Sequence, residues 1–475
     1  MENASAILRA IDDVVWGPLM LVFMLGTGGY LMVRMRFLPI RNLGYALKLA
    51  MGFGRHTKEK EEGDISSFSS LMTELAATIG TGNIVGVATA MVLGGPGALV
   101  WMLLSALVGF STKLAESLLA VKYRTVNDRG EISGGPMYTM LYGFTNRKLG
   151  RVCGTLFALF AVFASFGMGN MTQANSISSA MNETFGISEA LTGLAVTILA
   201  ILVILGGIRT IAKVTQVVVP CMAIFYLAGA FLVILVNFRN LPGGILEIIK
   251  MAFSPKAAAG GVDGTIVASM GQAMRWGVSR GVFSNEAGLG AAGISAAAAN
   301  TDDPVRQGYI SMTGVFFDTI VICVVTGLAL AASGVLGITD GAGEPITGSA
   351  LTIAAFSTTF GKWGGYLVSI GIVLFAFATI IGWEYQGEKA FEFLVKKSDY
   401  CIIYRFVYAL TAFLGATCAL DVVWDFSDIM NALMAVPNLF TVLLMSKTAC
   451  AEVFRYQNII EAKTAPFQDN DHLIK

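Results

Sequence analysis

The sequence predicts an all-α polytopic membrane protein. Of its 475 residues, 55% are hydrophobic and only 13% are charged, whereas a soluble domain carries about 25% charged residues. Long apolar runs recur along the whole chain, and charged or glycine- and proline-rich stretches separate them. Because a helix of roughly 20 apolar residues crosses a bilayer, this pattern predicts a bundle of transmembrane helices.

Eleven apolar runs are expected to cross the membrane. The first, 15–34, follows the amino-terminal segment MENASAILRAIDDVVW, which lacks a signal-peptide cleavage pattern and which we expect to be retained. The other ten form two groups of five. They cover 68–92, 98–121, 152–180, 190–208 and 214–236, and then 264–299, 307–335, 363–387, 402–420 and 427–446.

The charges in the loops predict the orientation. If the amino terminus is outside, the cytoplasmic segments hold 24 of the 32 Lys and Arg residues and the external segments hold five. Basic residues favour cytoplasmic loops, so we expect the amino terminus outside and the carboxyl terminus in the cytoplasm, in the plasma membrane. Acidic residues also number 32, so the net charge gives no sign of a nucleic-acid partner.

The sequence contains no pattern typical of an enzyme or of a metal centre. The six cysteines lie far apart and there are two histidines, so no disulfide framework or zinc spacing is visible. No nucleophile with its base, no P-loop and no dinucleotide fingerprint is found. We therefore expect a protein that is not an enzyme and that does not use ATP or a redox cofactor.

The two groups of five spans predict an inverted repeat. Because five is odd, the second group crosses the membrane upside down relative to the first. The chain then divides into an amino-terminal helix with its loop, a first repeat, a second repeat and a cytoplasmic tail. These parts are expected at 1–65, 66–240, 241–446 and 447–475.

The leading helix of each repeat is expected to be discontinuous. Gly80, Gly82 and Gly86 lie in the middle of the first, where IGTGN at 79–83 is expected to unwind, and RGVFSNEAGLGAAG at 280–293 interrupts the second. Glycine within a helix costs about 1 kcal/mol relative to alanine, which favours unwinding at these positions. The alternative interpretation is that the glycines only allow close helix packing, a common use of small residues in membranes. Unwound carbonyls can bind a small cation, and the amino ends of half-helices attract a carboxylate. Such a site suits an amino acid and a sodium ion.

Charged residues inside spans are expensive and are therefore functional candidates. Glu74 and Asp318 are expected either on an ion or proton path or as acceptors for the N–H groups of the unwound segments. Glu286 is expected to cap the second break. Lys113 and Glu116, three residues apart, are expected to neutralise each other.

Three motifs resemble those of the sodium:alanine (alanine or glycine:cation) symporter family: TELAATIGTGNIVGVATA at 73–90, SGGPMYTM at 133–140 and RGVFSNEAGLG at 280–290. The resemblance covers nearly the whole chain. It implies the amino acid-polyamine-organocation superfamily and the leucine-transporter fold, with one helix added before the ten-helix core. It also implies a symporter that couples inward sodium flux to uptake of alanine or glycine by alternating access. Proton-coupled transport and an amino-acid-gated channel or receptor remain alternatives.

The resemblance further implies which residues form the site. The N–H groups around Gly80 and Gly82 would hold the substrate carboxylate, and the side chains of Phe283 and Trp383 would restrict the substrate to the size of alanine or glycine. The expected substrate-binding residues are Thr78, Gly80, Gly82, Asn83, Gln173, Phe283, Asn285, Thr379 and Trp383.

The resemblance implies two sodium positions, one at Asn83 and the Thr78 carbonyl, and one at the carbonyls of Ala76 and Ile79 with the Thr379 hydroxyl. Each side chain also has an ordinary structural explanation. An intramembrane glutamine often joins helices, threonine often bonds its own helix, and buried aromatic residues often only pack. The expected partners are alanine or glycine, sodium and membrane lipid, and we expect a monomer.

Overall fold

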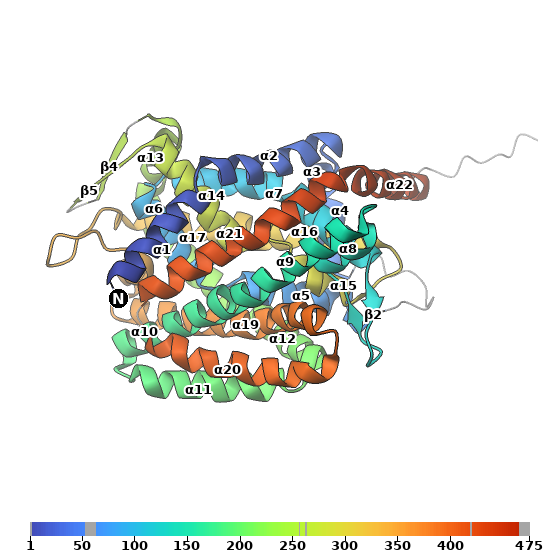
Figure 1. Ribbon diagram of the computed structural model, residues 1–475. Coiled ribbons are helices and arrows are strands. Elements are labelled where there is room, and N and C mark those ends of the chain that lie inside the picture. Colours follow the sequence, from blue (N-terminus) through green and yellow to red (C-terminus); the bar gives the residue numbers. More distant parts are fainter. Residues whose placement is uncertain (1, 53–62, 256, 262–263, 419, 465–475) are drawn as a thin grey trace, which may run out of the picture.

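The computed structural model describes residues 2–52, 63–255, 257–261, 264–418 and 420–464. Most helices run along one common direction, and the amino terminus and α22 (Ser446–Thr464) lie at opposite ends of the bundle (Figure 1). Seven of the described helical segments are long and apolar enough to cross a membrane. Two further apolar helices, Pro18–Arg34 and Glu189–Ile204, are shorter. The chain is therefore an integral membrane protein.

The first half of the chain contains one interrupted apolar helix and several continuous ones. Its helices are α1 (Glu2–Val15), α2 (Pro18–Arg34), α3 (Leu38–Arg41), α4 (Leu43–Ala50), α5 (Ser67–Thr78), η1 (Thr81–Asn83), α6 (Val85–Leu93), α7 (Ala98–Lys122), α8 (Pro136–Gly143), α9 (Arg147–Phe166), η2 (Gly167–Met171), α10 (Thr172–Phe185), α11 (Glu189–Ile204), α12 (Gly207–Val236), η3 (Phe238–Asn240) and α13 (Leu241–Phe253).

The second half also contains an interrupted helix. Its helices before α22 are α14 (Met270–Asn285), α15 (Ala291–Ala297), α16 (Pro304–Val315), η4 (Phe316–Cys323), α17 (Val324–Ser333), α18 (Gly348–Phe360), α19 (Trp363–Val395), η5 (Ser398–Tyr400), α20 (Cys401–Thr417) and α21 (Leu420–Leu444). The apolar stretch expected to be helical at 350–356 lies within α18.

Short strand pairs lie between the helices. β1 (Ile65–Ser66) pairs in parallel with β6 (Ala299–Asn300), while β2 (Thr125–Val126) with β3 (Ile132–Ser133) and β4 (Ala257–Gly261) with β5 (Gly264–Ala268) form antiparallel hairpins. The span predicted at 264–299 was therefore placed too early. Its helix starts at Met270, because Ser269 and Gln272 form a capping box there.

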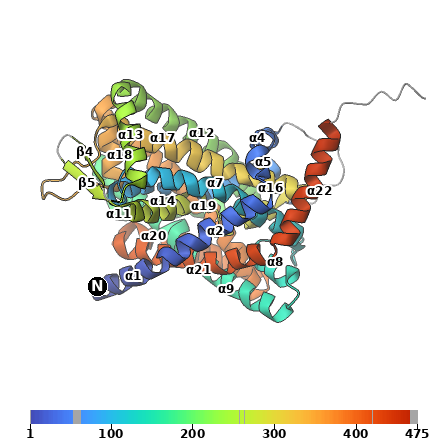
Figure 2. The ribbon, with the colours of Figure 1, turned by 90° about the horizontal axis from the view of Figure 1, so that it is seen from above.

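Long helices surround the interrupted ones. α7 packs against α14 and α16, while α12 and α19 pack against α5. In the view from above, α12 and α17 lie along one edge of the bundle and α9 and α21 along the opposite edge (Figure 2). Large apolar side chains such as Leu202 and Ile224 point outward, as expected for a lipid-facing surface, and the polar groups gather inside.

Candidate functional site at the two helix breaks

The first predicted break lies between α5 and α6. α5 ends at Thr78, Gly80 is extended with φ −130° and ψ −151°, and the 3-10 turn η1 follows. The Gly80 N–H donates to Asn83 Oδ1 at 3.0 Å. A Cβ at Gly80 would lie 2.5 Å from Thr379 Oγ1 and 3.1 Å from Gln173 Oε1. Glycine is needed here because side chains of two other helices, α10 and α19, stand against its backbone.

Gln173 contacts this break from α10. The π-helical segment η2 directly precedes α10, and such wide turns often occur at functional sites because they redirect side chains. Gln173 Nε2 donates to the Met168 carbonyl at 3.0 Å, and Gln173 Oε1 accepts from the Thr81 N–H at 3.2 Å. Gln173 therefore bonds its own helical segment through Met168 and links it to the unwound backbone at Thr81.

Thr379 on α19 faces the carboxyl end of α5. Thr379 Oγ1 lies 3.1 Å from the Ala76 carbonyl oxygen and 3.4 Å from that of Ile79, and it also donates to the Phe375 carbonyl at 3.2 Å. Thr78 lies beside this group, with its hydroxyl donating to the Leu75 carbonyl. Three oxygen atoms thus converge where a helix end concentrates partial negative charge. Sodium ions in interrupted-helix transporters bind at such places.

The second break separates α14 from α15. α14 ends at Asn285, and Glu286 adopts a left-handed φ of 57°. Asn285 Nδ2 donates to Thr319 Oγ1 at 2.9 Å. Glu286 Oε1 accepts from the Trp383 indole N–H at 2.7 Å. The expectation that Glu286 caps backbone N–H groups is therefore wrong, because the indole of α19 supplies the donor instead.

Asp318 joins the two breaks. It is fully buried in the π-helical segment η4. Asp318 Oδ1 accepts from Asn83 Nδ2 at 2.7 Å, and Oδ2 accepts from the hydroxyls of Ser284 and Thr319 at 2.8 Å each. These donors come from the first break, the end of α14 and η4 itself. The sequence left the role of Asp318 open, and the structure places it at the junction.

Lys113 pairs with Glu74 rather than with Glu116, which corrects the sequence-based expectation. Lys113 Nζ lies 3.0 Å from Glu74 Oε1 and donates to the Asn285 carbonyl at 2.8 Å. Glu116 accepts from Asn438 Nδ2 at 2.5 Å. Lys113 and Glu74 are both fully buried. The Asn285 carbonyl at the end of α14 accepts from Lys113, so the ammonium group connects α5, α7 and α14.

Aromatic side chains cover the junction on the side where α14 begins. The ring of Phe283 stacks on that of Trp424 with 5.1 Å between centroids. Arg280 lies over both rings and forms a buried ion pair with Asp428 of α21. A Cβ at Gly82 would lie 3.2 Å from Phe283. Phe283 therefore rests directly on the first break.

The predicted site residues fall into two sets. Those of α5, η1, α10 and α19 contact one another around the first break, as described for Gly80, Gln173 and Thr379. Asn285 and the indole N–H of Trp383 contact Thr319 and Glu286 around the second break. Sequence reasoning missed Trp424 and Asp428. The acid-rich run DVVWDFSD at 421–428 was the available signal.

The interrupted helices and their buried polar junction define an integral membrane protein of the transporter class. The chain belongs to the sodium:alanine symporter family, whose model matches residues 1–470. It is 47% identical to the sodium/alanine symporter AgcS of Methanococcus maripaludis, over 97% of this chain and 99% of that protein. It is 37% identical to the probable sodium/glutamine symporter GlnT of Bacillus subtilis, over 93% of this chain and 88% of that protein.

A crystal structure of MhsT in complex with L-phenylalanine has a similar fold. The TM-score is 0.56 at 12% sequence identity, with 83% of this chain and 99% of that chain covered. At this identity the likeness shows the fold alone, and it supports the predicted leucine-transporter fold. The relatives are transporters, so the chain is a transporter and not an enzyme.

Proposed function

We propose that this protein is a symporter that couples inward sodium flux to uptake of alanine or glycine by alternating access. One observation carries the proposal. Asp318 links the two helix breaks, and the oxygen cluster at Thr379 lies beside the first of them. Family membership supports sodium-coupled amino acid transport. The residue roles below are our assignments.

The proposed architecture has eleven spans, one followed by a five-plus-five inverted repeat, in the parts 1–65, 66–240, 241–446 and 447–475. In support, the described part of the chain has seven long apolar segments and two shorter ones. It also has two interrupted helices, α5–α6 and α14–α15, one at the start of each proposed repeat. We propose the amino terminus outside, the carboxyl terminus in the cytoplasm, and a monomer in the plasma membrane.

Two sodium positions are proposed. One lies among the Ala76 and Ile79 carbonyls and the Thr379 hydroxyl, whose oxygen lies 3.1 and 3.4 Å from the two carbonyl oxygens. A cation bound among the three oxygens would replace the hydrogen bonds that now join them. The other lies at Asn83 and the Thr78 carbonyl, and Asp318 would supply its negative charge. Oxygen ligands at unwound helix ends are suited to sodium, which is co-transported and is not a resident cofactor.

The substrate carboxylate is proposed to bind the N–H groups of the first break. In this structure Asn83 accepts from the Gly80 N–H and Gln173 accepts from the Thr81 N–H. We propose that the substrate carboxylate replaces these two amide oxygens as the acceptor of the N–H groups, and that the amides of Gln173 and Asn83 then turn to contact the bound substrate and sodium. We propose that Phe283 limits the substrate to a small side chain, a limit worth testing because GlnT is named for glutamine.

Coupling follows from the position of Asn83. Its amide donates to Asp318 at 2.7 Å, and its oxygen accepts from the Gly80 N–H at 3.0 Å. A sodium ion at Asp318 would therefore reorganise the same backbone that holds the substrate. Each ligand then raises the affinity of the other by the same factor. The Arg280–Asp428 pair and the Phe283–Trp424 stack are proposed to close the outer side during the cycle.

Binding to purified protein tests this site. Asn83→Ala and Gln173→Ala each remove a polar contact at the break, and loss of such a contact to a charged group is worth about 1.5–3 kcal/mol, or at least about tenfold in affinity. Ser176→Ala, one turn further along α10, is the control, since its hydroxyl bonds the Thr172 carbonyl of its own helix. Wild-type alanine affinity in both test variants would refute the assignment.

A proton-coupled transporter is the second candidate, because the buried carboxylate of Glu74 could carry the proton. Glu74 is fully buried and pairs with Lys113. Apart from this ion pair, its oxygens have no hydrogen-bond partner in the described part of the chain. Alanine uptake into proteoliposomes separates the two candidates. Sodium coupling predicts uptake driven by a sodium gradient at equal pH, and proton coupling predicts none. Saturable counterflow would exclude an amino-acid-gated channel or receptor.

A further inference from the structure

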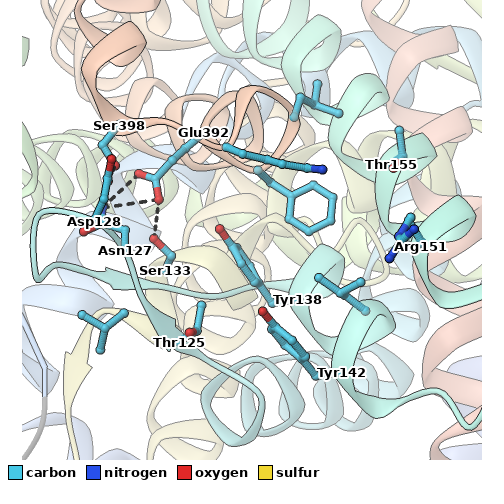
Figure 3. A pocket seen from close by; sticks show the side chains of 15 residues that line it. Thr125, Asn127, Asp128, Ser133, Tyr138, Tyr142, Arg151, Thr155, Glu392 and Ser398 are labelled. Atoms are coloured by element: carbon cyan, nitrogen blue, oxygen red, sulfur yellow. Dashed lines mark hydrogen bonds between the residues drawn. The ribbon is translucent and has the colours of Figure 1, made fainter. Parts of the chain in front are cut away.

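A cavity of about 520 Å³ lies away from the helix breaks, between the β2–β3 hairpin, α8, α9 and the end of α19. Its volume is typical of a small-molecule site. Figure 3 shows that its charges are separated. Asp128 and Glu392 lie on one side, Arg151 lies on the other, and the Tyr138 and Tyr142 rings lie between them. A ligand that fits this lining carries a positive and a negative group some distance apart.

The acidic side offers one accessible carboxylate. Glu392 is buried and already accepts from Ser133 Oγ at 2.6 Å and from Lys389 Nζ at 3.0 Å. Asp128 is exposed, and the Ser398 hydroxyl donates to one of its oxygens. That hydrogen bond lowers the pKa of Asp128 and so favours its ionised form. Asp128 is therefore the residue that can receive a cationic group.

The basic side borders the lipid-facing surface. Arg151 and Lys396 both line the cavity and are exposed, and in the described part of the chain neither forms an ion pair. On α9, outward-facing apolar side chains begin at the residue after Arg151 and recur at helical spacing, among them Val152, Leu156 and Phe163. From the lipid surface inward, the order is therefore apolar strip, basic group, aromatic rings and carboxylate.

We propose that this cavity binds the headgroup of phosphatidylethanolamine. Its acyl chains would lie along α9, its phosphate on Arg151 and Lys396, and its ammonium group on Asp128. This order of groups is the order within the lipid, and basic pockets between transmembrane helices bind lipid phosphates by the same charge-assisted contacts.

The lining favours a primary ammonium over the trimethylammonium of phosphatidylcholine. A primary ammonium donates hydrogen bonds to a carboxylate, whereas choline is usually recognised by aromatic faces arranged around it. The rings of Tyr138 and Tyr142 stack on each other, with an interplanar angle of 21° and 6.4 Å between centroids, so they do not form such a cage. Phosphatidylglycerol has no cation for Asp128.

Lipid binding to the purified full-length chain tests the proposal. The chain is delipidated in detergent and titrated with phosphatidylethanolamine, phosphatidylcholine, phosphatidylglycerol or soluble phosphoethanolamine, with native mass spectrometry as readout. No sodium or amino acid is added, so the result does not depend on the proposed transport. Arg151→Gln and Asp128→Asn are the test variants. Lys148→Gln is the control, because Lys148 is an exposed cation of α9 outside the cavity lining.

We expect phosphatidylethanolamine to bind most tightly, and its half-saturating concentration to rise at least about tenfold in each test variant and to stay unchanged in the control. Thermal unfolding without lipid confirms that the variants are folded. Unchanged affinity in Arg151→Gln and Asp128→Asn would overturn the proposal. So would equal or tighter binding of phosphatidylcholine, of phosphatidylglycerol or of soluble phosphoethanolamine.

Discussion

Gly80→Ala would place a methyl group inside the proposed site. The new Cβ would lie 2.5 Å from Thr379 Oγ1 and 3.1 Å from Gln173 Oε1, closer than carbon and oxygen atoms can approach without displacement. The backbone itself is not the obstacle, since φ is −130° at Gly80 and alanine adopts that value readily. The effect must therefore come from pushing the two side chains away from the break.

Overpacking a well-filled interior costs about 1–3 kcal/mol. If the side chains of Thr379 and Gln173 move away to relieve this strain, alanine affinity should fall by roughly 5- to 150-fold. The assay is isothermal calorimetry of alanine binding in saturating sodium. Gly86→Ala is the matched control, because the nearest atom to its new Cβ, Cδ of Arg280, is 3.9 Å away. Alanine within α6 is also a better helix former than glycine.

The thermal stability of the two variants is measured alongside binding. We expect Gly80→Ala to insert and fold but to lose alanine binding, and Gly86→Ala to bind like the wild type. In a Thr379→Ala background the closest contact is removed, so the stability loss from Gly80→Ala should shrink. Wild-type alanine affinity in Gly80→Ala would refute the placement of the site at the first break.

Three further predictions concern buried charges. Asp318→Asn removes the charge proposed to attract sodium, so the sodium concentration that half-saturates alanine binding should rise at least about tenfold. Lys113→Met leaves Glu74 buried without its cation and should destabilise the protein by about 3–5 kcal/mol in denaturant unfolding, while adding Glu74→Gln should recover part of the loss. Burial and the nearby carboxylate of Asp428 raise the pKa of Asp12 to about 7. Because the folded-state pKa exceeds the unfolded value of 3.8, stability should fall as pH rises from about 4 to about 7 and level off above that, and Asp12→Asn should remove this dependence in thermal unfolding.

The sequence predicted the helix breaks well because their cause is local. Glycines and polar residues inside an apolar span conflict with a continuous helix, so the break at Gly80 and a second break within 280–293 could be placed without a structure. The second break is narrower than predicted, because residues 280–285 still belong to α14. The Thr379 cluster was expected only through the family resemblance. The geometry brings its three oxygen atoms together, while its role as a sodium site stays a prediction.

The partners of buried charges could not be predicted, because they depend on packing between distant helices. Spacing along one helix suggested that Lys113 would pair with Glu116, yet Lys113 reaches Glu74 on α5 and the Asn285 carbonyl. Glu286 likewise accepts from Trp383, 97 residues away. The start of α14 was misplaced for a different reason, since 264–268 is apolar enough to read as a span but pairs as a strand with β4.

The most direct test of the central claim is alanine binding to the purified wild-type protein as a function of sodium concentration, with choline replacing sodium at constant ionic strength. Because Asn83 connects the proposed ion and substrate positions, alanine affinity should rise with sodium, and alanine should raise sodium affinity by the same factor. An alanine dissociation constant that is the same with and without sodium would contradict the account.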